Sequence, residues 1–219
     1  MCTGEEYRLE ATTKRRLGAA SLYAITPDAE PAGVERLVAG WLRGGVDVVQ
    51  LRHKSLPRGR LLELATALAG ACSAAGALFL VNDHVDIALL SGADGVHVGP
   101  DDLTVAAARR VAGGRLLVGA SASRPEAGRE AEAQGAEYLG SGPAYATPLK
   151  TEKAVIGPAG VAAVAAAVRI PVFAIGGIHR GRLPELRAAG VGRVCAIRAL
   201  GEPADPEAEA RAWREALTG

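Results

Sequence analysis

Residues 77–103 read ALFLVNDHVDIALLSGADGVHVGPDDL. A short apolar run ends at Asn82 and Asp83, a helical segment follows, and a second apolar run ends shortly before Asp102. Runs that are apolar throughout, rather than alternating with polar residues, are typical of strands buried on both faces of a parallel sheet. The stretch therefore predicts a strand–helix–strand unit in which a carboxylate follows each strand.

The same unit recurs along the chain: a short apolar strand, a loop, and a helix rich in Ala and Leu. The predicted strands are 22–26, 47–52, 78–83, 95–98, 116–121, 137–142, 172–176 and 193–197. The predicted helices are 34–43, 60–75, 85–90, 105–111, 126–134, 159–168, 183–189 and 206–217. This alternation indicates an α/β fold. It fits a (β/α)₈ TIM barrel in a single domain, residues 21–219, preceded by a partly ordered N-terminal extension, residues 1–20.

A doubly wound open sheet is the alternative architecture. Such a sheet usually carries a glycine-rich phosphate turn after its first strand, whereas the first predicted strand here is followed by Pro27 and Asp28. We therefore favour the barrel, in which catalytic residues lie on the loops after the carboxyl ends of the strands. The residues at these strand ends are the candidates for function.

The composition argues against several classes of function. The 219 residues carry a formal net charge of +1 and only 4% aromatic residues, which argues against nucleic acid as a partner. No apolar run is long enough to span a membrane, and residues 1–20 are too polar for a signal peptide. Cys2, Cys72 and Cys195 are scattered without metal-ligand spacing. A cytoplasmic location is therefore expected.

Asp83 and Asp102 are candidate metal ligands. The carboxyl ends of neighbouring parallel strands lie side by side, so these two carboxylates could share one Mg²⁺, which prefers one or two carboxylates plus phosphate and water oxygens. Each aspartate could instead cap the next helix, but the doubled pattern favours the metal. The four histidines share no metal-like spacing, and His97, in a predicted strand, is interpreted as a hydrogen-bonded core residue.

The second predicted strand ends in VVQLRHK. Side chains alternate along a strand, so Gln50 and Arg52 share one face, and Lys54 follows just beyond. An amide and two cations at a barrel mouth predict a pocket for an anionic substrate. The alternative is an arginine that fills the barrel beside a neighbouring carboxylate, but inward polar residues are costly unless they are used.

The later strand ends carry groups that suit phosphate. Ser121 could donate a hydrogen bond to phosphate or cap the next helix. The long loop 144–156 is typical of a lid over a barrel mouth, and it contains Thr147 and Lys150. Gly177 belongs to a glycine pair that lets backbone N–H groups approach a ligand, at the usual phosphate position of barrels.

With these residues in place, the chain resembles the thiamine phosphate synthase family, also called thiamine phosphate pyrophosphorylase. The motifs that carry the resemblance are VQLRHK, VNDHVDIALLSGADGVHVGPDDL, YLGSGPAYATPLK and AIGGI, and the likeness covers residues 22–217. It implies a Mg²⁺-dependent transferase of thiamine biosynthesis. Its small-molecule substrates would be 4-amino-2-methyl-5-(diphosphooxymethyl)pyrimidine and a thiazole phosphate, joined by a dissociative substitution. Neither nucleic acid nor a membrane is expected as a partner, and a homodimer is left open.

The resemblance also implies a role for each matched residue. The pyrimidine diphosphate would be bound by polar groups at the earlier strand ends and the lid: Gln50, Arg52, Lys54, Asn82, Ser121 and Lys150. Mg²⁺ would be held on the diphosphate by Asp83 and Asp102. The thiazole phosphate would be bound by Thr147, Gly177, Ile197 and Arg198. The leaving pyrophosphate would be stabilised by three catalytic cations: Arg52, Lys54 and Lys150.

Two positions depart from the family pattern, and both concern the thiazole phosphate. The family loop commonly reads PTxTK, but the loop here reads ATPLK, so Leu149 replaces a hydroxyl that would contact the phosphate. The eighth strand often ends in Ile-Ser, whereas Arg198 follows Ile197 here. Arg198 could bind the phosphate in place of the lost hydroxyl, or it could crowd the pocket.

Two alternative functions remain. The paralogous thiazole tautomerases use a histidine after the fifth strand, where this chain reads SASRP with Ser123, so the sequence disfavours that activity. A non-catalytic protein that binds a thiamine precursor is the other alternative, and the altered thiazole half keeps it open. Product formation from the two substrates, with and without Mg²⁺, separates the three functions.

Overall fold

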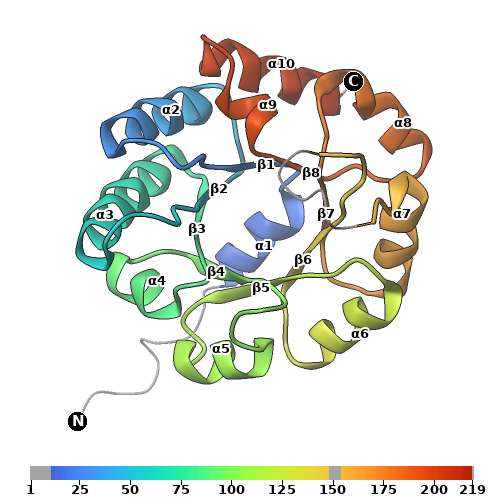
Figure 1. Cartoon of the computed structure of the whole chain (residues 1–219), viewed down its shortest axis with the longest axis horizontal. Helices are drawn as coiled ribbons and strands as arrows, with labels where there is room; N and C mark the ends of the chain where they lie inside the picture. Colours follow the sequence, from blue (N-terminus) through green and yellow to red (C-terminus); the bar gives the residue numbers. More distant parts are fainter. Residues whose placement is uncertain (1–10, 148–153, 219) are drawn as a thin grey trace.

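The computed structural model describes residues 11–147 and 154–218. Its parallel strands close into one barrel, in which each strand pairs with the next and the last pairs with the first (Figure 1). The strands are β1 (Leu22–Ile25), β2 (Val48–Leu51), β3 (Leu78–Asn82), β4 (Gly95–Val98), β5 (Leu117–Ser121), β6 (Tyr138–Ser141), β7 (Val172–Ile175) and β8 (Val194–Ala196). The predicted (β/α)₈ barrel and each predicted strand are confirmed.

Helices surround the barrel, and every predicted helix is present with slightly different bounds. They are α2 (Pro31–Arg43), α3 (Arg58–Ala75), α4 (Val85–Ser91), α5 (Val105–Ala112), α6 (Pro125–Ala133), α7 (Gly157–Ala167), α8 (Leu183–Ala188) and α10 (Pro206–Thr218). The structure adds three helical segments that were not predicted: α1 (Ala11–Ala19), η1 (Arg180–Arg182) and α9 (Arg198–Gly201). None of the described helices is both long and apolar enough to cross a membrane.

The strands are buried on both faces because they lie between two apolar layers. Outside the barrel, strand residues pack against the helices, and inside it Tyr23, Tyr138 and Phe173 meet edge to face with ring centroids 5.3 to 6.2 Å apart. Gly119 leaves room for this cluster, since a Cβ there would lie 1.9 Å from the Tyr138 ring. This double burial explains why the strands lack polar alternation.

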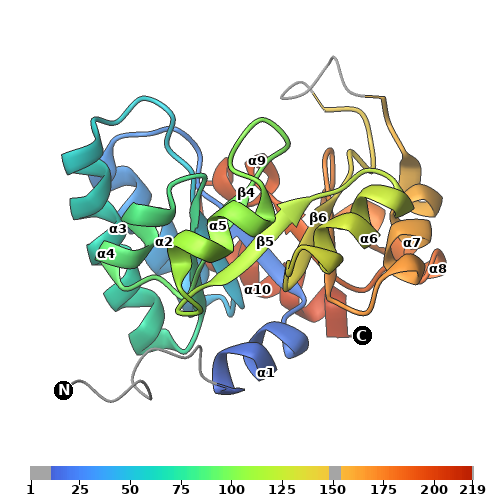
Figure 2. The ribbon, with the colours of Figure 1, turned by 90° about the horizontal axis from the view of Figure 1, so that it is seen from below.

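Helix α1 closes the amino-terminal end of the barrel (Figure 2). Leu17 and Ala20 are buried in the interior cluster, and Lys14 forms an ion pair with Glu137 at 2.8 Å. Residues 11–20 of the expected extension therefore contact the barrel, whereas residues 1–10 lie outside the described part of the chain. Because α1 covers this end, substrate access is left to the opposite end, where the strands finish.

Candidate active site

Two cavities open at the carboxyl ends of the strands. The smaller measures about 250 Å³ and lies beside β2 and β3. Three predicted site residues line it: Lys54, Asn82 and Asp83. The larger measures about 520 Å³ and lies beside β5 to β8. Five predicted site residues line it: Ser121, Thr147, Gly177, Ile197 and Arg198. Eight candidate residues thus divide between the two cavities, whereas Gln50, Arg52 and Asp102 are not among the residues that line them. The larger cavity has the volume of a typical small-molecule site.

The two carboxylates predicted to bind metal interact with each other. The pKa of Asp83 is raised to about 6, first by burial and then by the hydrogen bond and the charge of Asp102. Asp102 is itself oriented by the N–H of Gly99, which donates to its Oδ2 at 2.9 Å. Two carboxylates held this close repel one another, and a divalent cation relieves the repulsion. The donor set therefore fits Mg²⁺.

The protein supplies few ligands to such a cation. Within residues 11–147 and 154–218, no group of three or more His, Cys, Asp and Glu side chains could hold a metal ion. A site with only two carboxylates is characteristic of Mg²⁺, which keeps several waters and takes oxygens from a substrate phosphate. The remaining ligands would therefore come from a phosphorylated substrate and from solvent.

Two cations lie around this carboxylate pair. Lys54 lines the same cavity as Asp83, and the positive charges of Lys54 and Arg52 both lower the pKa of Asp83. The Arg52 side chain is 28% exposed and its Nη1 lies 3.7 Å from Asp28 Oδ2. Gln50 points into the barrel, is 1% exposed, and its Nε2 donates to the hydroxyl of Tyr23 at 2.6 Å. The end of β2 therefore places an amide inside the barrel and two cations at its mouth.

The backbone of Asp83 holds its side chain at the mouth in a strained conformation. Its φ of 63° lies in the left-handed region, which costs most residues other than glycine roughly 1–2 kcal/mol and costs aspartate and asparagine less. The N–H of Asp83 donates to the carbonyl of His97 at 2.8 Å, which ties the end of β3 to β4. This hydrogen bond supports the strained backbone and keeps the carboxylate beside Asp102.

We expect Asp83→Asn to stabilise the metal-free protein near neutral pH. The pKa of Asp83 is about 6 in the folded state, compared with about 4 in the unfolded chain. The folded state binds the proton more tightly, so ionisation of Asp83 lowers the free energy of unfolding. This loss is absent below about pH 4 and complete above about pH 6. Because the group is half-exposed, screening reduces this cost to about 1 kcal/mol. Asparagine removes the charge and tolerates the left-handed backbone.

Urea unfolding in the presence of a chelator measures this effect. The gain in free energy of unfolding should appear at about pH 7.5 and vanish at about pH 4. Asp86→Asn is the matched control: a hydrogen bond from Arg58 lowers the pKa of Asp86, so this substitution should reduce stability at neutral pH. An Asp83→Asn protein with wild-type stability at both pH values would contradict the prediction.

A chain of polar contacts crosses the barrel interior from β2 to β5. It starts at Gln50, whose Nε2 donates to Tyr23, and the Tyr23 hydroxyl lies 3.5 Å from that of Tyr138. The Tyr138 hydroxyl is 3.2 Å from Nδ1 of His97, and Nε2 of His97 is 3.0 Å from the hydroxyl of Ser121. The chain links two predicted substrate-binding residues that lie on opposite sides of the barrel mouth.

These contacts change two interpretations made from the sequence. Ser121 does not cap α6, because the N-cap position is occupied by Arg124. The Ser121 side chain lines the larger cavity at the barrel mouth instead. His97 is hydrogen-bonded, as expected, but its partner Ser121 lines a cavity rather than the core. Tyr23, His97 and Tyr138 were missed as site residues. Strand alternation, which places all three on the inner face, was the available signal.

The glycine pair after β7 requires glycine at both positions. Gly176 and Gly177 have φ angles of 100° and 63°, in the left-handed region that favours glycine. A Cβ on Gly177 would lie 2.5 Å from the carbonyl oxygen of Ala146, so a larger residue would displace the segment after β6. Across the larger cavity, Arg198 begins α9 and pairs with Glu202, with Nε 2.5 Å from Oε1.

Some candidate residues lie outside the described part of the chain. Lys150, predicted to act on the pyrophosphate, and Leu149, which departs from the family pattern, both fall within residues 148–153. Conversely, Arg124 and His179 line the larger cavity and were not predicted. Each follows a strand end by only a few residues, in SASRP and AIGGIH, so their position in the chain was the signal that could have identified them.

Fold and site together define a class of protein: a (β/α)₈ barrel whose mouth combines paired carboxylates, cations and a glycine pair, as suits phosphorylated substrates. Residues 22–200 match the family TMP-TENI, described as thiamine monophosphate synthase. The chain therefore belongs to the thiamine monophosphate synthase family. The resemblance predicted from the motifs is confirmed.

Curated relatives carry the same description. The chain is 43% identical over 205 residues to a thiamine-phosphate synthase of Gloeobacter violaceus, a match that covers 91% of this chain and 60% of the relative. It is 44% identical over 198 residues to a putative thiamine-phosphate synthase of Geobacter sulfurreducens, covering 88% of this chain and 92% of the relative. The chain thus spans about 60% of the length of the first relative and most of the second.

Solved structures show the same barrel. A thiamine phosphate pyrophosphorylase from Pyrococcus furiosus superposes with a TM-score of 0.84 at 33% identity, covering 94% of this chain and 97% of that one. A 3-hexulose-6-phosphate synthase superposes with a TM-score of 0.71 at 23% identity, covering 89% of this chain and 99% of that one. The second similarity extends to the fold alone.

Proposed function

We propose that this protein catalyses Mg²⁺-dependent thiamine phosphate synthesis. The substrates would be 4-amino-2-methyl-5-(diphosphooxymethyl)pyrimidine and a thiazole phosphate, and the products thiamine phosphate and pyrophosphate. The observation that carries the proposal is the interacting pair Asp83 and Asp102, with the charges of Arg52 and Lys54 beside it at the barrel mouth. Membership of the thiamine monophosphate synthase family supports the choice of substrates.

In the proposed reaction, the bond between the pyrimidine methylene carbon and the diphosphate oxygen breaks first. The electron pair of that bond leaves with pyrophosphate, and the lone pair of the thiazole nitrogen then forms the new C–N bond. This dissociative order demands stabilisation of the leaving group more than proton removal, so no strong general base is needed. The abundance of cations at the mouth suits that demand.

The pyrimidine diphosphate and its leaving group would be held by residues in and beside the smaller cavity, together with Ser121 from the larger one. Asp83 and Asp102 would hold Mg²⁺, which when bound supplies charge neutralisation to the diphosphate. Arg52 would present its planar fork to two phosphate oxygens, and Lys54 would add a point charge. Gln50, Asn82 and Ser121 would orient the pyrimidine diphosphate, and Lys150 would act as a further cation on the pyrophosphate.

The residues of the larger cavity would bind the thiazole phosphate. Thr147, Gly177, Ile197 and Arg198 all line it, and the loops after β7 and β8 are the usual phosphate position of barrels. A cytoplasmic location is part of the proposal, supported by Cys72 and Cys195, which are buried and form no disulfide. Assembly as a homodimer is left open.

Product formation from the two purified substrates tests the proposed function. With Mg²⁺ we expect thiamine phosphate and pyrophosphate in equal amounts, and with excess chelator neither product. Isomerisation of the thiazole without joining would indicate a tautomerase, which the absence of histidine from the segment SASRP disfavours. Binding of either substrate without any turnover would indicate a non-catalytic binding protein and overturn the proposal.

Arg198→Ala is expected to raise the KM for the thiazole phosphate about ten- to a hundredfold, because a guanidinium can bind phosphate through two hydrogen bonds. The KM for the pyrimidine diphosphate should change little. Arg198 pairs with Glu202 in the free protein, so a phosphate must compete with that carboxylate. Glu202→Gln should therefore lower the KM for the thiazole phosphate by weakening the competitor.

Saturation curves for both substrates measure these effects. Leu149→Thr, at a position outside the described residues, is the companion variant, because it restores the hydroxyl that Arg198 is proposed to replace. An Arg198→Ala enzyme with an unchanged KM for the thiazole phosphate would refute this role. A lower KM would show instead that Arg198 obstructs the pocket.

A further inference from the structure

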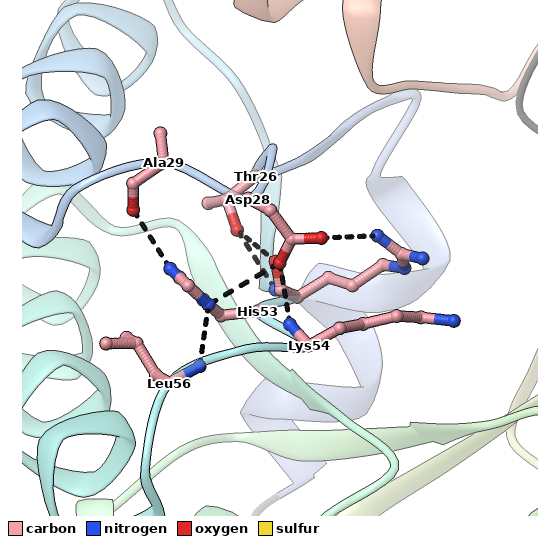
Figure 3. Close-up of polar contacts among 7 residues, drawn as sticks. Thr26, Asp28, Ala29, His53, Lys54 and Leu56 are labelled. Carbon is pink, nitrogen blue, oxygen red and sulfur yellow. Dashed lines mark hydrogen bonds and ion pairs between the residues drawn. The ribbon is translucent and has the colours of Figure 1, made fainter.

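The loop after β1 is joined to the loop that carries Arg52 and Lys54. Thr26 makes the first contact: its hydroxyl accepts a hydrogen bond from the N–H of Arg52 at 3.0 Å and lies 3.2 Å from the carbonyl oxygen of the same residue. Asp28 makes the second: its Oδ1 accepts a hydrogen bond from the N–H of Lys54 at 2.6 Å (Figure 3). These contacts continue the β1–β2 pairing beyond Leu51, where β2 ends.

The second carboxylate oxygen of Asp28 faces the guanidinium of Arg52. Oδ2 lies 3.7 Å from Nη1, and the two side chains are 41% and 28% exposed. An ion pair this long and this exposed to solvent adds little stability. Its effect is on orientation, because Arg52 also lies beside Asp83, whose pKa it lowers. The guanidinium therefore faces a carboxylate of the β1 loop, and its charge also acts on Asp83.

His53 fills the space between the two loops. Its Nε2 lies 2.9 Å from the carbonyl oxygen of Ala29. Its Nδ1 lies 3.2 Å from the backbone N–H of Leu56, which donates to it, and 3.5 Å from Oδ1 of Asp28.

Asp28 contacts the residues on either side of His53, namely Arg52 and Lys54. The imidazole is only 6% exposed and is fixed at both nitrogens. Figure 3 shows the Lys54 side chain extending away from His53, and Lys54 lines the smaller cavity with Asp83. The backbone hydrogen bond to Asp28 thus sets the point from which the Lys54 side chain enters the site.

We infer that Asp28 is a positioning residue for the pyrimidine diphosphate half of the site. It fixes the backbone of Lys54 through one oxygen and the guanidinium of Arg52 through the other. The inference rests on the proposed function in so far as it names the substrate, but the contacts themselves concern only this chain. Asp28 is not itself expected to touch the substrate, so its loss should weaken binding and leaving-group stabilisation rather than abolish the reaction.

Two substitutions test separately the contacts made by the two carboxylate oxygens of Asp28. Asp28→Asn keeps an oxygen that can accept from Lys54 but removes the charge beside Arg52, and we expect kcat/KM for the pyrimidine diphosphate to fall about three- to tenfold. Asp28→Ala removes both contacts and should lower it about thirtyfold or more. The KM for the thiazole phosphate should stay within about twofold in both variants, a selectivity that general damage to the barrel would not produce.

Asp86→Ala is the matched control, because it removes another exposed aspartate that pairs with an arginine, Arg58. It should leave both substrates' kinetic constants near those of the wild type. Should Asp28→Ala fail to fold, Asp28→Asn alone decides. Wild-type kcat/KM for the pyrimidine diphosphate in Asp28→Asn and Asp28→Ala, or an equal loss for both substrates, would overturn the inference.

Calorimetric titration of inorganic pyrophosphate with Mg²⁺ separates this inference from the proposed reaction. A weaker pyrophosphate affinity in Asp28→Ala than in the wild type or Asp86→Ala supports the positioning role even if the wild-type protein forms no thiamine phosphate. That combination would refute the proposed reaction alone. Unchanged pyrophosphate affinity in Asp28→Ala refutes the positioning role, whatever the activity.

Discussion

Asp102→Ala should lower kcat about a thousandfold or more while the barrel stays folded. Asp102 lies in the exposed loop between β4 and α5, so its truncation removes no core contact. The N–H of Gly99 loses its acceptor, but water can replace it at this exposed position. The catalytic loss has a different cause: the remaining carboxylate, Asp83, cannot hold the metal on the diphosphate as two carboxylates can.

Kinetics across a range of Mg²⁺ concentrations, with circular dichroism to monitor folding, measure this effect. Asp101→Ala is the control, since it removes an exposed carboxylate from the same loop and should leave kcat within about twofold. Asp102→Asn keeps an oxygen for the N–H of Gly99 but loses the charge, and it should be nearly as slow as Asp102→Ala. Full activity in Asp102→Ala would show that the metal assignment is wrong.

Arg52→Lys should lower kcat/KM for the pyrimidine diphosphate about 30- to 300-fold. Lysine keeps the positive charge but lacks the planar fork that binds two phosphate oxygens at once. The ammonium group is also a single point charge, so it cannot pair with Asp28 and act on Asp83 at the same time, as the guanidinium does. The loss should therefore appear in both substrate binding and leaving-group stabilisation.

Arg58→Lys is the control for this substitution. Arg58 begins α3, is 55% exposed, and pairs with Asp86, a contact that a lysine can retain. Its kinetic constants should stay within about twofold of the wild type. Initial rates at varied pyrimidine diphosphate concentration compare the two variants. Similar behaviour of Arg52→Lys and Arg58→Lys would mean that the end of β2 does not form the diphosphate pocket.

Sequence alone determined the barrel and supplied the candidate residues for the site. Val172–Ile175 is apolar along its whole length, and Leu78–Asn82 is apolar up to Asn82, because helices cover one face of these strands and the barrel interior covers the other. Once the strands were placed, the alternation of side chains along β2 predicted that Gln50 lies on the inner face of the barrel. The carboxyl ends of parallel strands lie side by side, which predicted that Asp83 and Asp102 interact. Both inferences follow from local periodicity.

The tertiary structure decided which partner each site residue has. The contacts of Asp28 with Arg52 and Lys54 join two loops, and that of Ser121 with His97 joins two strands. Neither pairing leaves a periodic signal, because an aspartate in a loop or a serine at a strand end also fits a helix cap or an exposed surface. Closing the barrel sets the distances between such residues, and those distances exist only in the folded chain.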